Sequence, residues 1–512
     1  MSGSGVWDVF QGRGLTGLPV LEEMVMACLM LVFSAVFLLW GFGRGRVKDV
    51  SSFPAVVLSQ DERRQLRRLV LPMECVQSVK PSMVKVASEV VRDGGSAWDG
   101  VRALVSNRRR YRFDVEKYKA PRAHTPLLIF VNRKSGGQKG NLLLNQFRAF
   151  FPAHQVYDMT EGGGPETGLL FFEKVPNYRV LVAGGDGSVA WVLACIDSLG
   201  LEYQPPVGIL PIGTGNDLAR ELGWGGGLDG SFGTALVNHL NEIARANIMP
   251  LDRWTVSFLT RESKQSKKKK KKTQVLNNYL GIGVDAQIAL NFHESRERSP
   301  HLFTSRFVNK YIWYASSGGK EILMQRFKDF SKNVQLECDG EVVPIPPDTE
   351  GLILLNISCY GGGVDLWGNE DDVSDMVSTH DKRLEVVSVA SSFQLGAAQV
   401  GLARPTRLCQ CSVAKIVVNN MSLPVQVDGE PFTMSPFGEI SVSYLNQGMM
   451  LCDNKRTGRI SPSHEYQNIM HDVLQWGVTR RIINKSQKGQ LEELLLQELA
   501  RHKRTTSVDS LF

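Results

Sequence analysis

One stretch of the sequence constrains the fold more than any other: residues 181–188, which read Leu-Val-Ala-Gly-Gly-Asp-Gly-Ser. The apolar run indicates a buried strand, and the glycines end it before a helix that we expect over 189–199. Glycine lets a backbone approach a phosphate closely, and the N–H groups that open a helix attract anions. The stretch therefore predicts a phosphate-binding turn, although α/β folds also place glycines in such turns for steric reasons alone.

The pattern of apolar strand, glycine turn and helix occurs twice more in the sequence. Three such units imply a parallel sheet whose turns gather at the carboxyl edge of the strands, which is where open α/β sheets bind ligands. The other two units place strands at 127–131 and 207–211, turns at 132–137 and 212–217, and helices at 140–151 and 218–222.

Polar side chains in these turns suit a polyphosphate ligand. Asp186 and Asp217 would lie beside the phosphates, and two carboxylates next to a polyphosphate normally indicate Mg²⁺, which prefers hard oxygen ligands. Lys134 either reaches a phosphate from the first turn or is a solvated loop lysine. Asn216 either contacts the nucleotide or caps its helix, because both roles use the same side-chain oxygen.

The commoner nucleotide-binding motifs are absent from the sequence. No Gly-x-x-x-x-Gly-Lys-[Ser/Thr] loop occurs, and no Gly-x-Gly-x-x-Gly follows a strand with an acidic residue about 20 positions on. The sequence therefore predicts neither a P-loop enzyme nor a dinucleotide-binding Rossmann domain of the usual kind.

Seven motifs occur in order along the sequence: 184–188, 210–220 and 224–227, and then 251–254, 277–279, 292–297 and 427–431. In order and spacing, over roughly 125–444, they resemble the eukaryotic diacylglycerol kinases, the first three the catalytic domain and the last four the accessory region. Ser188 stands where that family usually has threonine, and it keeps the hydroxyl.

The resemblance implies an α/β protein: a Rossmann-like parallel-sheet nucleotide-binding domain followed by a β-sandwich-like accessory domain. It implies ATP-dependent phosphorylation of diacylglycerol to phosphatidic acid in lipid signalling, with ATP and Mg²⁺ as cofactors. Strand-like segments at 254–258, 351–358, 383–389, 415–418 and 440–444 agree with a β-rich second domain. The expected metal ligands are Asp186 and Asp217, and the expected nucleotide-binding residues are Asn132, Lys134, Gly184, Gly185, Asp186, Gly187, Ser188, Gly213, Thr214, Gly215 and Asn216.

A possible general base lies in the segment Asp428-Gly429-Glu430. A glycine between two carboxylates makes a tight turn that presents an acid, and phosphoryl transfer to a hydroxyl needs a proton acceptor. The local sequence alone favours an ordinary Asp-Gly hairpin turn. The resemblance implies that Asp428 is the catalytic base and that Glu430 supports it.

Two other functions remain open from the sequence. The glycine turn at 184–187 is shared by related kinases that act on a sphingoid base, ceramide or a nicotinamide dinucleotide, and 216–220 and 224–227 favour diacylglycerol over these. A catalytically silent membrane scaffold is the other alternative. The intact Asp186, Asp217 and Asp428 argue against it.

An uncharged apolar run over 24–42 predicts a transmembrane helix, because nineteen helical residues reach roughly 28 Å. A cleaved signal peptide and a buried core helix are the alternatives. Basic residues at 44, 46 and 48 follow the run, so we expect a single-pass membrane protein whose catalytic domain faces the cytosol. The sequence divides into a tail and anchor at 1–43, a basic connector at 44–120, the catalytic domain at 121–250, the accessory domain at 251–453, and a C-terminal helical extension and tail at 454–512.

Charge and cysteine content complete the expectations. Of the net charge of +7, part lies in the cluster 108–110 and in the lysine run 267–272, which we expect to be a disordered loop. We expect the partners to be diacylglycerol in the membrane and anionic lipids at these basic segments, with no nucleic acid. The eight cysteines include no Cys-x-x-Cys pair, so the sequence predicts no zinc-binding cysteine-rich module.

Overall fold

The computed structural model describes most of the chain between Leu58 and Asp453, and only these parts are discussed below. Within them, no helix is both long and apolar enough to cross a membrane. The apolar run at 24–42, the cluster at 108–110 and the extension at 454–512 lie outside the described residues. The described residues are 58–78, 111–119, 124–136, 139–161, 164–227, 232–261, 269–298, 327, 329–368, 377–398, 401 and 403–453.

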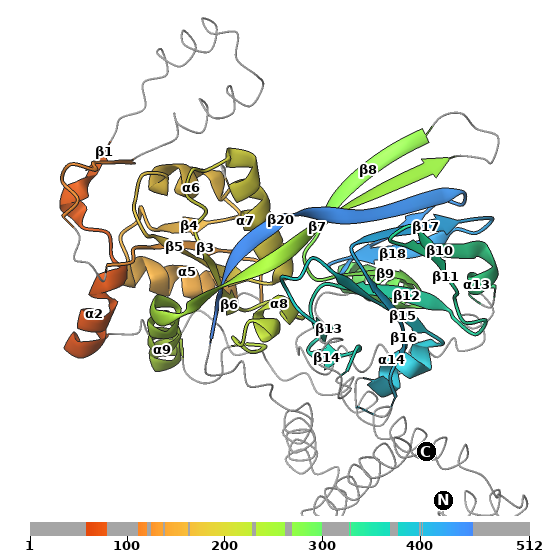
Figure 1. Ribbon diagram of the computed structural model, residues 1–512. Helices are drawn as coiled ribbons and strands as arrows, with labels where there is room; N and C mark the ends of the chain where they lie inside the picture. Colours follow the sequence, from red (N-terminus) through yellow and green to blue (C-terminus); the bar gives the residue numbers. More distant parts are fainter. Residues whose placement is uncertain are drawn as a thin grey trace, which may run out of the picture.

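The first domain is built on four parallel strands in the order β4, β3, β5, β6. Every residue of β3 and β6 is buried, as expected of strands that are covered on both faces. Helices lie on both sides of this sheet (Figure 1). The strands are β3 (Leu127–Val131), β4 (Val156–Asp158), β5 (Arg179–Gly184) and β6 (Val207–Pro211), and the helices are α5 (Lys139–Phe150), α6 (Glu166–Phe172), α7 (Asp186–Leu199), α8 (Asp217–Glu221) and α9 (Phe232–Arg245).

The three strand, turn and helix units that the sequence predicts are therefore confirmed. The expected strands at 127–131 and 207–211 are β3 and β6, and the expected helices correspond to α5, α7 and α8 within one to three residues at their ends. The parallel pairing brings the carboxyl ends of β3, β5 and β6 to one edge, so the three glycine turns are neighbours.

Part of the predicted connector packs into the first domain. Residues 58–78 form α2 (Gln60–Leu66), η2 (Arg67–Leu69), η3 (Met73–Cys75) and β1 (Val76–Ser78), and β1 pairs with β2 (Tyr111–Phe113). Leu66, Leu69 and Leu71 are at most 2% exposed and belong to the core of this domain. Sequence analysis predicts only a basic connector over 44–120, whereas the inward-facing leucines make part of it belong to the first domain.

Two long strands join the domains. β7 (Asn247–Arg261) and β20 (Gly438–Cys452) pair antiparallel along nearly their whole lengths, and Met450 of β20 also pairs in parallel with Val207 of β6. One ten-stranded sheet therefore passes from the first domain into the second, as Figure 1 shows. β7 crosses position 250, where sequence analysis divides the two domains.

The second domain is a sandwich of that sheet against a six-stranded one, in the order β16, β15, β12, β9, β18, β19. Side chains from both sheets form one apolar core, for example Trp254 and Phe258 of β7 with Leu280 and Leu352 of the facing sheet. The remaining elements are β8 (Lys269–Leu276), β9 (Tyr279–Gly283), α10 (Val284–Arg298), α13 (Phe330–Asn333), β10 (Val334–Cys338), β11 (Glu341–Val343), β12 (Gly351–Leu355), β13 (Cys359–Tyr360), β14 (Val364–Asp365), β15 (Leu384–Val389), α14 (Ser392–Ala398), β16 (Thr406–Cys411), β17 (Val413–Val418), β18 (Leu423–Val427) and β19 (Glu430–Met434).

The lysine run is not simply a disordered loop, and that prediction is wrong for its last four residues. Lys269–Lys272 form the start of β8 and pair with 258–261 of β7. Backbone pairing at the end of a hairpin leaves the lysine side chains in solvent, so their mutual repulsion does not prevent the strand. The Lys272 ammonium also lies 4.0 Å from the centre of the Phe432 ring, a favourable cation–π contact.

Glu385 is a buried carboxyl on β15, with 0% of the residue exposed. Gln410 donates a hydrogen bond of 3.0 Å to its Oε1, while its Oε2 has no partner in the structure. Burial is the main cause that raises the pKa of Glu385 to about 8. Its protonated form is therefore favoured in the folded protein, and the stability that this contributes is full below about pH 4.5 and is lost as the pH rises through about 8.

We predict that Glu385→Gln removes this pH dependence, because the amide is neutral and keeps the shape of the protonated acid. At pH 9 the variant should be about 1–3 kcal/mol more stable than the parent protein, and near pH 5 the difference should be small. Urea unfolding at several pH values measures this, with the exposed Glu341→Gln as a control. Parallel stability curves for the parent and Glu385→Gln would show that Glu385 is charged in the fold.

Candidate functional site

Two of the glycine turns touch each other. Ile212 and Gly213, which follow β6, donate backbone hydrogen bonds of 3.0 and 3.3 Å to the carbonyl of Gly184 at the end of β5. A Cβ on Gly213 would lie 2.5 Å from the Cα of Gly185, and a Cβ on Gly185 would lie 3.1 Å from the Cα of Gly213. Glycine at 185 and 213 is therefore required by the contact between the turns, which is the steric reason that sequence analysis left open.

Gly187 is different, because a Cβ there would meet no protein atom within 4 Å. It is exposed and lies in the first turn of α7, and the opening turn of a helix attracts anions. Gly215 also borders this region, with only ordinary contacts to the carboxylates of Asp186 and Asp217. The protein itself does not demand glycine at 187, so the open space there fits a phosphate.

Asp186, and not Asn216, caps helix α8. The two carboxylate oxygens of Asp186 accept hydrogen bonds of 3.1 and 3.2 Å from the amides of Asp217 and Leu218, so Asp186 caps α8. Asn216 makes no capping bond; its Nδ2 donates to the carbonyls of Gly213 and Gly226 at 3.0 and 2.7 Å. Asn216 is 1% exposed and its Oδ1 has no partner, which leaves a buried acceptor for a ligand between the turns.

The carboxylate of Asp217 is held by the second domain. Its Oδ2 accepts a 2.9 Å hydrogen bond from the hydroxyl of Tyr279, and its Oδ1 accepts from the amides of Gly362 and Gly363, the latter at 3.1 Å. Asp217 is 1% exposed. Burial and neighbouring carboxylates raise the pKa of Tyr279 well above its usual value, so its hydroxyl stays protonated and donates.

Sequence analysis does not predict these donors. Gly361, Gly362 and Gly363 all have positive φ, and consecutive backbone N–H groups in such a turn form a concave anion-binding nest. The nest lies between β13 and β14, and its anion is the Asp217 side chain. The run of three glycines in the sequence indicates a tight turn, but it does not show which carboxylate the amides of that turn bind.

Asp428 lies at the tip of the β18–β19 hairpin with φ of 49°, followed by Gly429 at 84°. Its Oδ2 accepts from the amide and the side-chain Nδ2 of Asn277, both at 2.9 Å, and its Oδ1 accepts from the amides of Asn278 and Tyr279 at 2.7 and 3.2 Å. A carboxylate has about four lone-pair positions, so all of them are occupied. Burial nevertheless raises the pKa of Asp428.

Tyr279 brings the three aspartates into one cluster. Its amide donates to Asp428 and its hydroxyl to Asp217. Burial first, and then the charge of Asp217 and more weakly that of Asp428, raise the pKa of Asp186 to about 7. Glu430 is exposed at the start of β19 and is not shown to join this cluster.

The turn after β3 forms the other side of the site. Asn132 donates a 2.9 Å hydrogen bond to the buried hydroxyl of Ser188, which ties the first turn to the second. The Asn132 Oδ1 accepts from the amide of Lys134 at 3.0 Å, and the Lys134 side chain is exposed. Thr214 is also exposed, so both are accessible to a ligand.

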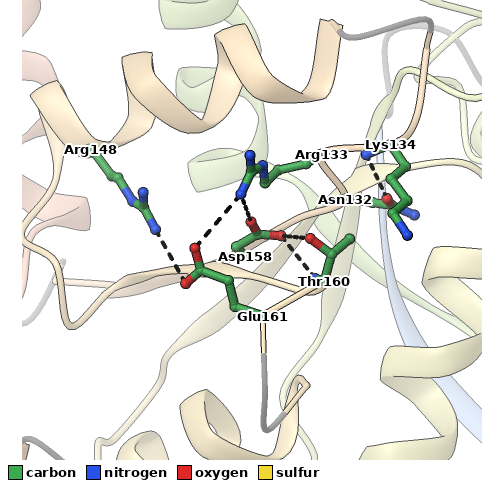
Figure 2. Close-up of polar contacts among 7 residues, drawn as sticks. All are labelled: Asn132, Arg133, Lys134, Arg148, Asp158, Thr160 and Glu161. Atoms are coloured by element: carbon green, nitrogen blue, oxygen red, sulfur yellow. Dashed lines mark hydrogen bonds and ion pairs between the residues drawn. The ribbon is translucent and has the colours of Figure 1, made fainter.

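Arg133, the neighbour of Asn132 in this turn, forms ion pairs with two acidic side chains, as Figure 2 shows. Its Nη1 lies 3.2 Å from the Asp158 carboxylate and 3.9 Å from that of Glu161, which in turn lies 3.8 Å from Arg148. Thr160 donates two hydrogen bonds of 2.8 Å to Asp158. The network orders the backbone from which Asn132 and Lys134 extend.

The carboxylates of Asp186 and Asp217 suit a metal ion that is held jointly by the protein and by the phosphates of a bound nucleotide. Among the described residues, no group of three or more histidine, cysteine, aspartate or glutamate side chains is arranged to hold a metal ion. Asp186 accepts two hydrogen bonds and Asp217 accepts three, so both keep free lone pairs. Mg²⁺ commonly uses one or two carboxylates together with waters and substrate phosphates, and these residues fit that pattern.

Comparison with known proteins assigns the two halves of this cluster to known domains. Residues 126–249 match the diacylglycerol kinase catalytic domain and residues 275–431 match the diacylglycerol kinase accessory domain. The chain carries the catalytic and accessory domains of the diacylglycerol kinase family. The resemblance that the sequence motifs indicate is thus confirmed.

Relatives named as diacylglycerol kinases support the same assignment. The chain is 42% identical to Diacylglycerol kinase 1 of Arabidopsis thaliana over 76% of its own length and 52% of that protein. It is 40% identical to Diacylglycerol kinase theta of Mus musculus over 63% of its length and 35% of that protein. It thus spans about half or less of these relatives. A diacylglycerol kinase structure from Bacillus anthracis is 17% identical with a TM-score of 0.40, covering 64% of this chain and 97% of that one.

We predict that Gly187→Asp folds normally but loses affinity for Mg²⁺·ATP by at least about 100-fold. A Cβ at this position meets no protein atom within 4 Å, and an acid is favourable in the first turn of a helix, but its charge would stand beside the phosphates. Gly187→Asn has the same size without the charge and should lose less. Calorimetric titration measures the affinity of both variants for Mg²⁺·ATP. Unchanged affinity in a folded Gly187→Asp variant would show that the phosphates do not bind at this turn.

Proposed function

We propose that this protein is an ATP-dependent diacylglycerol kinase that transfers the γ-phosphoryl group of ATP to the hydroxyl of diacylglycerol and gives phosphatidic acid. The observation that carries the proposal is the carboxylate cluster at the junction of the two domains. Asp186 and Asp217 come from the catalytic domain, while Tyr279 and Asp428 come from the accessory domain. The chain's relatives in plants and mammals bear the name of this kinase.

The residues of the first domain bind and orient the nucleotide in this proposal. The amides that open α7 and the space beside Gly187 receive the phosphates, and the buried Oδ1 of Asn216 accepts a hydrogen bond from the nucleotide. The exposed ammonium of Lys134 approaches the phosphates from the first turn. Asp186 and Asp217 would hold Mg²⁺, which when bound neutralises charge on the phosphates.

Asp428 takes the proton from the diacylglycerol hydroxyl in this proposal, with Glu430 supporting it from the same hairpin. Its burial favours proton uptake. Because four donors occupy the carboxylate, one must withdraw to admit the substrate hydroxyl. The Nδ2 group of Asn277 is the one donor of the four that belongs to a side chain, so it can turn away without breaking the backbone turn.

A kinase assay on the purified full-length chain tests the proposed function. The protein is supplied with γ-labelled ATP and mixed micelles that contain diacylglycerol, ceramide or a sphingoid base, with Gly187→Asp as the inactive control. We expect label in phosphatidic acid alone. Label in ceramide or in the sphingoid base instead would identify the protein as a related lipid kinase. No label in any lipid would favour the catalytically silent membrane scaffold.

We predict that Asp428→Asn lowers kcat by about 10²–10⁴-fold with little change in the affinity for ATP, because the amide keeps the shape but accepts no proton. A thermal melt must accompany the kinetics, since the amide also places an NH₂ group against the donors of residues 277–279. Weak ATP binding with a normal rate at saturating nucleotide would identify Asp428 as a metal or nucleotide ligand instead of the base.

We also propose how the enzyme reaches its substrate. Diacylglycerol stays in the bilayer, so the apolar run at 24–42 serves as a single-pass anchor that leaves the catalytic domain on the cytosolic side. Lys270, Lys271 and Lys272 are exposed on the β7–β8 hairpin, which projects from the sandwich in Figure 1, and they contact anionic lipid. Each charge near such a surface contributes about 1 kcal/mol.

We predict that deletion of residues 1–43 releases the protein from membranes but preserves activity on detergent-dispersed diacylglycerol. The described residues contain both domains of the site, so the chemistry does not need the deleted segment. Membrane fractionation after alkaline carbonate extraction measures the anchor. Easy extraction of the full-length protein, or carbonate-resistant attachment of the truncated one, would show that 24–42 is not the anchor.

A further inference from the structure

Three cysteine thiols meet at the edge of the sandwich that β16 forms, four strands away from β18, which leads to Asp428. Cys338 ends β10 in the ten-stranded sheet, and Cys409 and Cys411 lie on β16, the edge strand of the six-stranded sheet. The Sγ atoms of Cys409 and Cys338 are 3.3 Å apart, although the residues are 71 positions apart in the sequence. Two thiols on facing sheets are therefore already in contact.

The environment distinguishes the three sulfur atoms. Hydrogen bonds from the thiols of Cys338 and Cys411 lower the pKa of Cys409. The hydrogen bond with Cys409 raises the pKa of Cys338. Cys409 is half-buried, whereas Cys338 and Cys411 are 6% and 1% exposed. Cys409 is thus the most reactive and the most accessible of them. In the described part of the chain no cysteine group is arranged as a metal site.

We propose that Cys338 and Cys409 form an oxidation-sensitive thiol pair that closes to a disulfide with a small peroxide. The Cys409 thiolate attacks hydrogen peroxide, the O–O bond breaks and a sulfenic acid forms as hydroxide leaves. The Cys338 sulfur then attacks Cys409, the S–S bond forms and the sulfenic oxygen leaves as water. The two thiols lose two electrons in all, and the peroxide becomes two waters; a small dithiol reverses the reaction.

The position of the pair makes this modification independent of the proposed kinase chemistry. Three strands, β15, β12 and β9, separate β16 from β18, which leads to Asp428, so the two sites are about 19 Å apart across the sheet. The disulfide would link the two sheets of the sandwich covalently. It should stabilise the accessory domain without displacing the carboxylate cluster.

The experiment treats the purified full-length chain with hydrogen peroxide, blocks free thiols with iodoacetamide, and maps peptides by non-reducing mass spectrometry. We expect one cross-linked peptide pair that contains Cys338 and Cys409, a midpoint of thermal unfolding raised by several degrees, and reversal of both by dithiothreitol. Cys409→Ser and Cys338→Ala should each abolish the cross-link. Cys411→Ser and the distant Cys452→Ser are matched controls that should keep it.

Two results would overturn the proposal. One is full alkylation of both Cys338 and Cys409 after peroxide treatment, which would show that neither thiol pairs. The other is a cross-link that survives in Cys409→Ser with an unchanged thermal shift, which would show that another pair of thiols responds to the oxidant.

Discussion

The structure depends on one buried carboxylate, that of Asp217. It begins a helix of the catalytic domain, yet the three hydrogen bonds that satisfy it come from Tyr279, Gly362 and Gly363 of the accessory domain. A buried carboxylate without hydrogen-bond partners costs several kcal/mol, so docking against the accessory domain stabilises the catalytic domain. The same contacts turn Asp217 toward Asp186 and fix Tyr279 beside Asp428. Docking of the domains and construction of the site are one event.

The continuous sheet makes this docking rigid. β7 and β20 extend through both domains, and the buried Arg253 of β7 bonds to Asp197 of α7 and to Asn277 in the turn that Asp428 holds. Backbone pairing and this buried guanidinium thus set the distance between the phosphate turns and Asp428. A hinge between the domains would have to break these contacts, so we regard the arrangement of the phosphate turns and Asp428 as largely preformed.

The sequence predicts the features of the fold that depend on neighbouring residues alone, such as strands and turns. The buried strands at 127–131 and 207–211 follow from short apolar runs, and the glycine turns follow from their position after those runs. It does not predict contacts that the fold alone creates: Asp186 caps a helix 31 residues away, and the nest that holds Asp217 lies 145 residues away. The composition of the lysine run predicts a loop, because composition contains no information about backbone pairing with β7. The resemblance predicts Asp428 as a site residue, but nothing in the sequence predicts the four donors that hold its carboxylate.

Binding of Mg²⁺·ATP to Tyr279→Phe tests the central claim most directly. Tyr360→Phe is a matched control, because its ring lies 4.9 Å from that of Tyr279 and its hydroxyl bonds to Asp285 instead of Asp217. A hydrogen bond to a charged group contributes about 1.5–3 kcal/mol, so loss of the Tyr279 hydroxyl should weaken binding at least about tenfold while Tyr360→Phe stays within about twofold. Equal affinities in the two variants, measured by calorimetry on the full chain, would contradict the claim that the accessory domain positions Asp217.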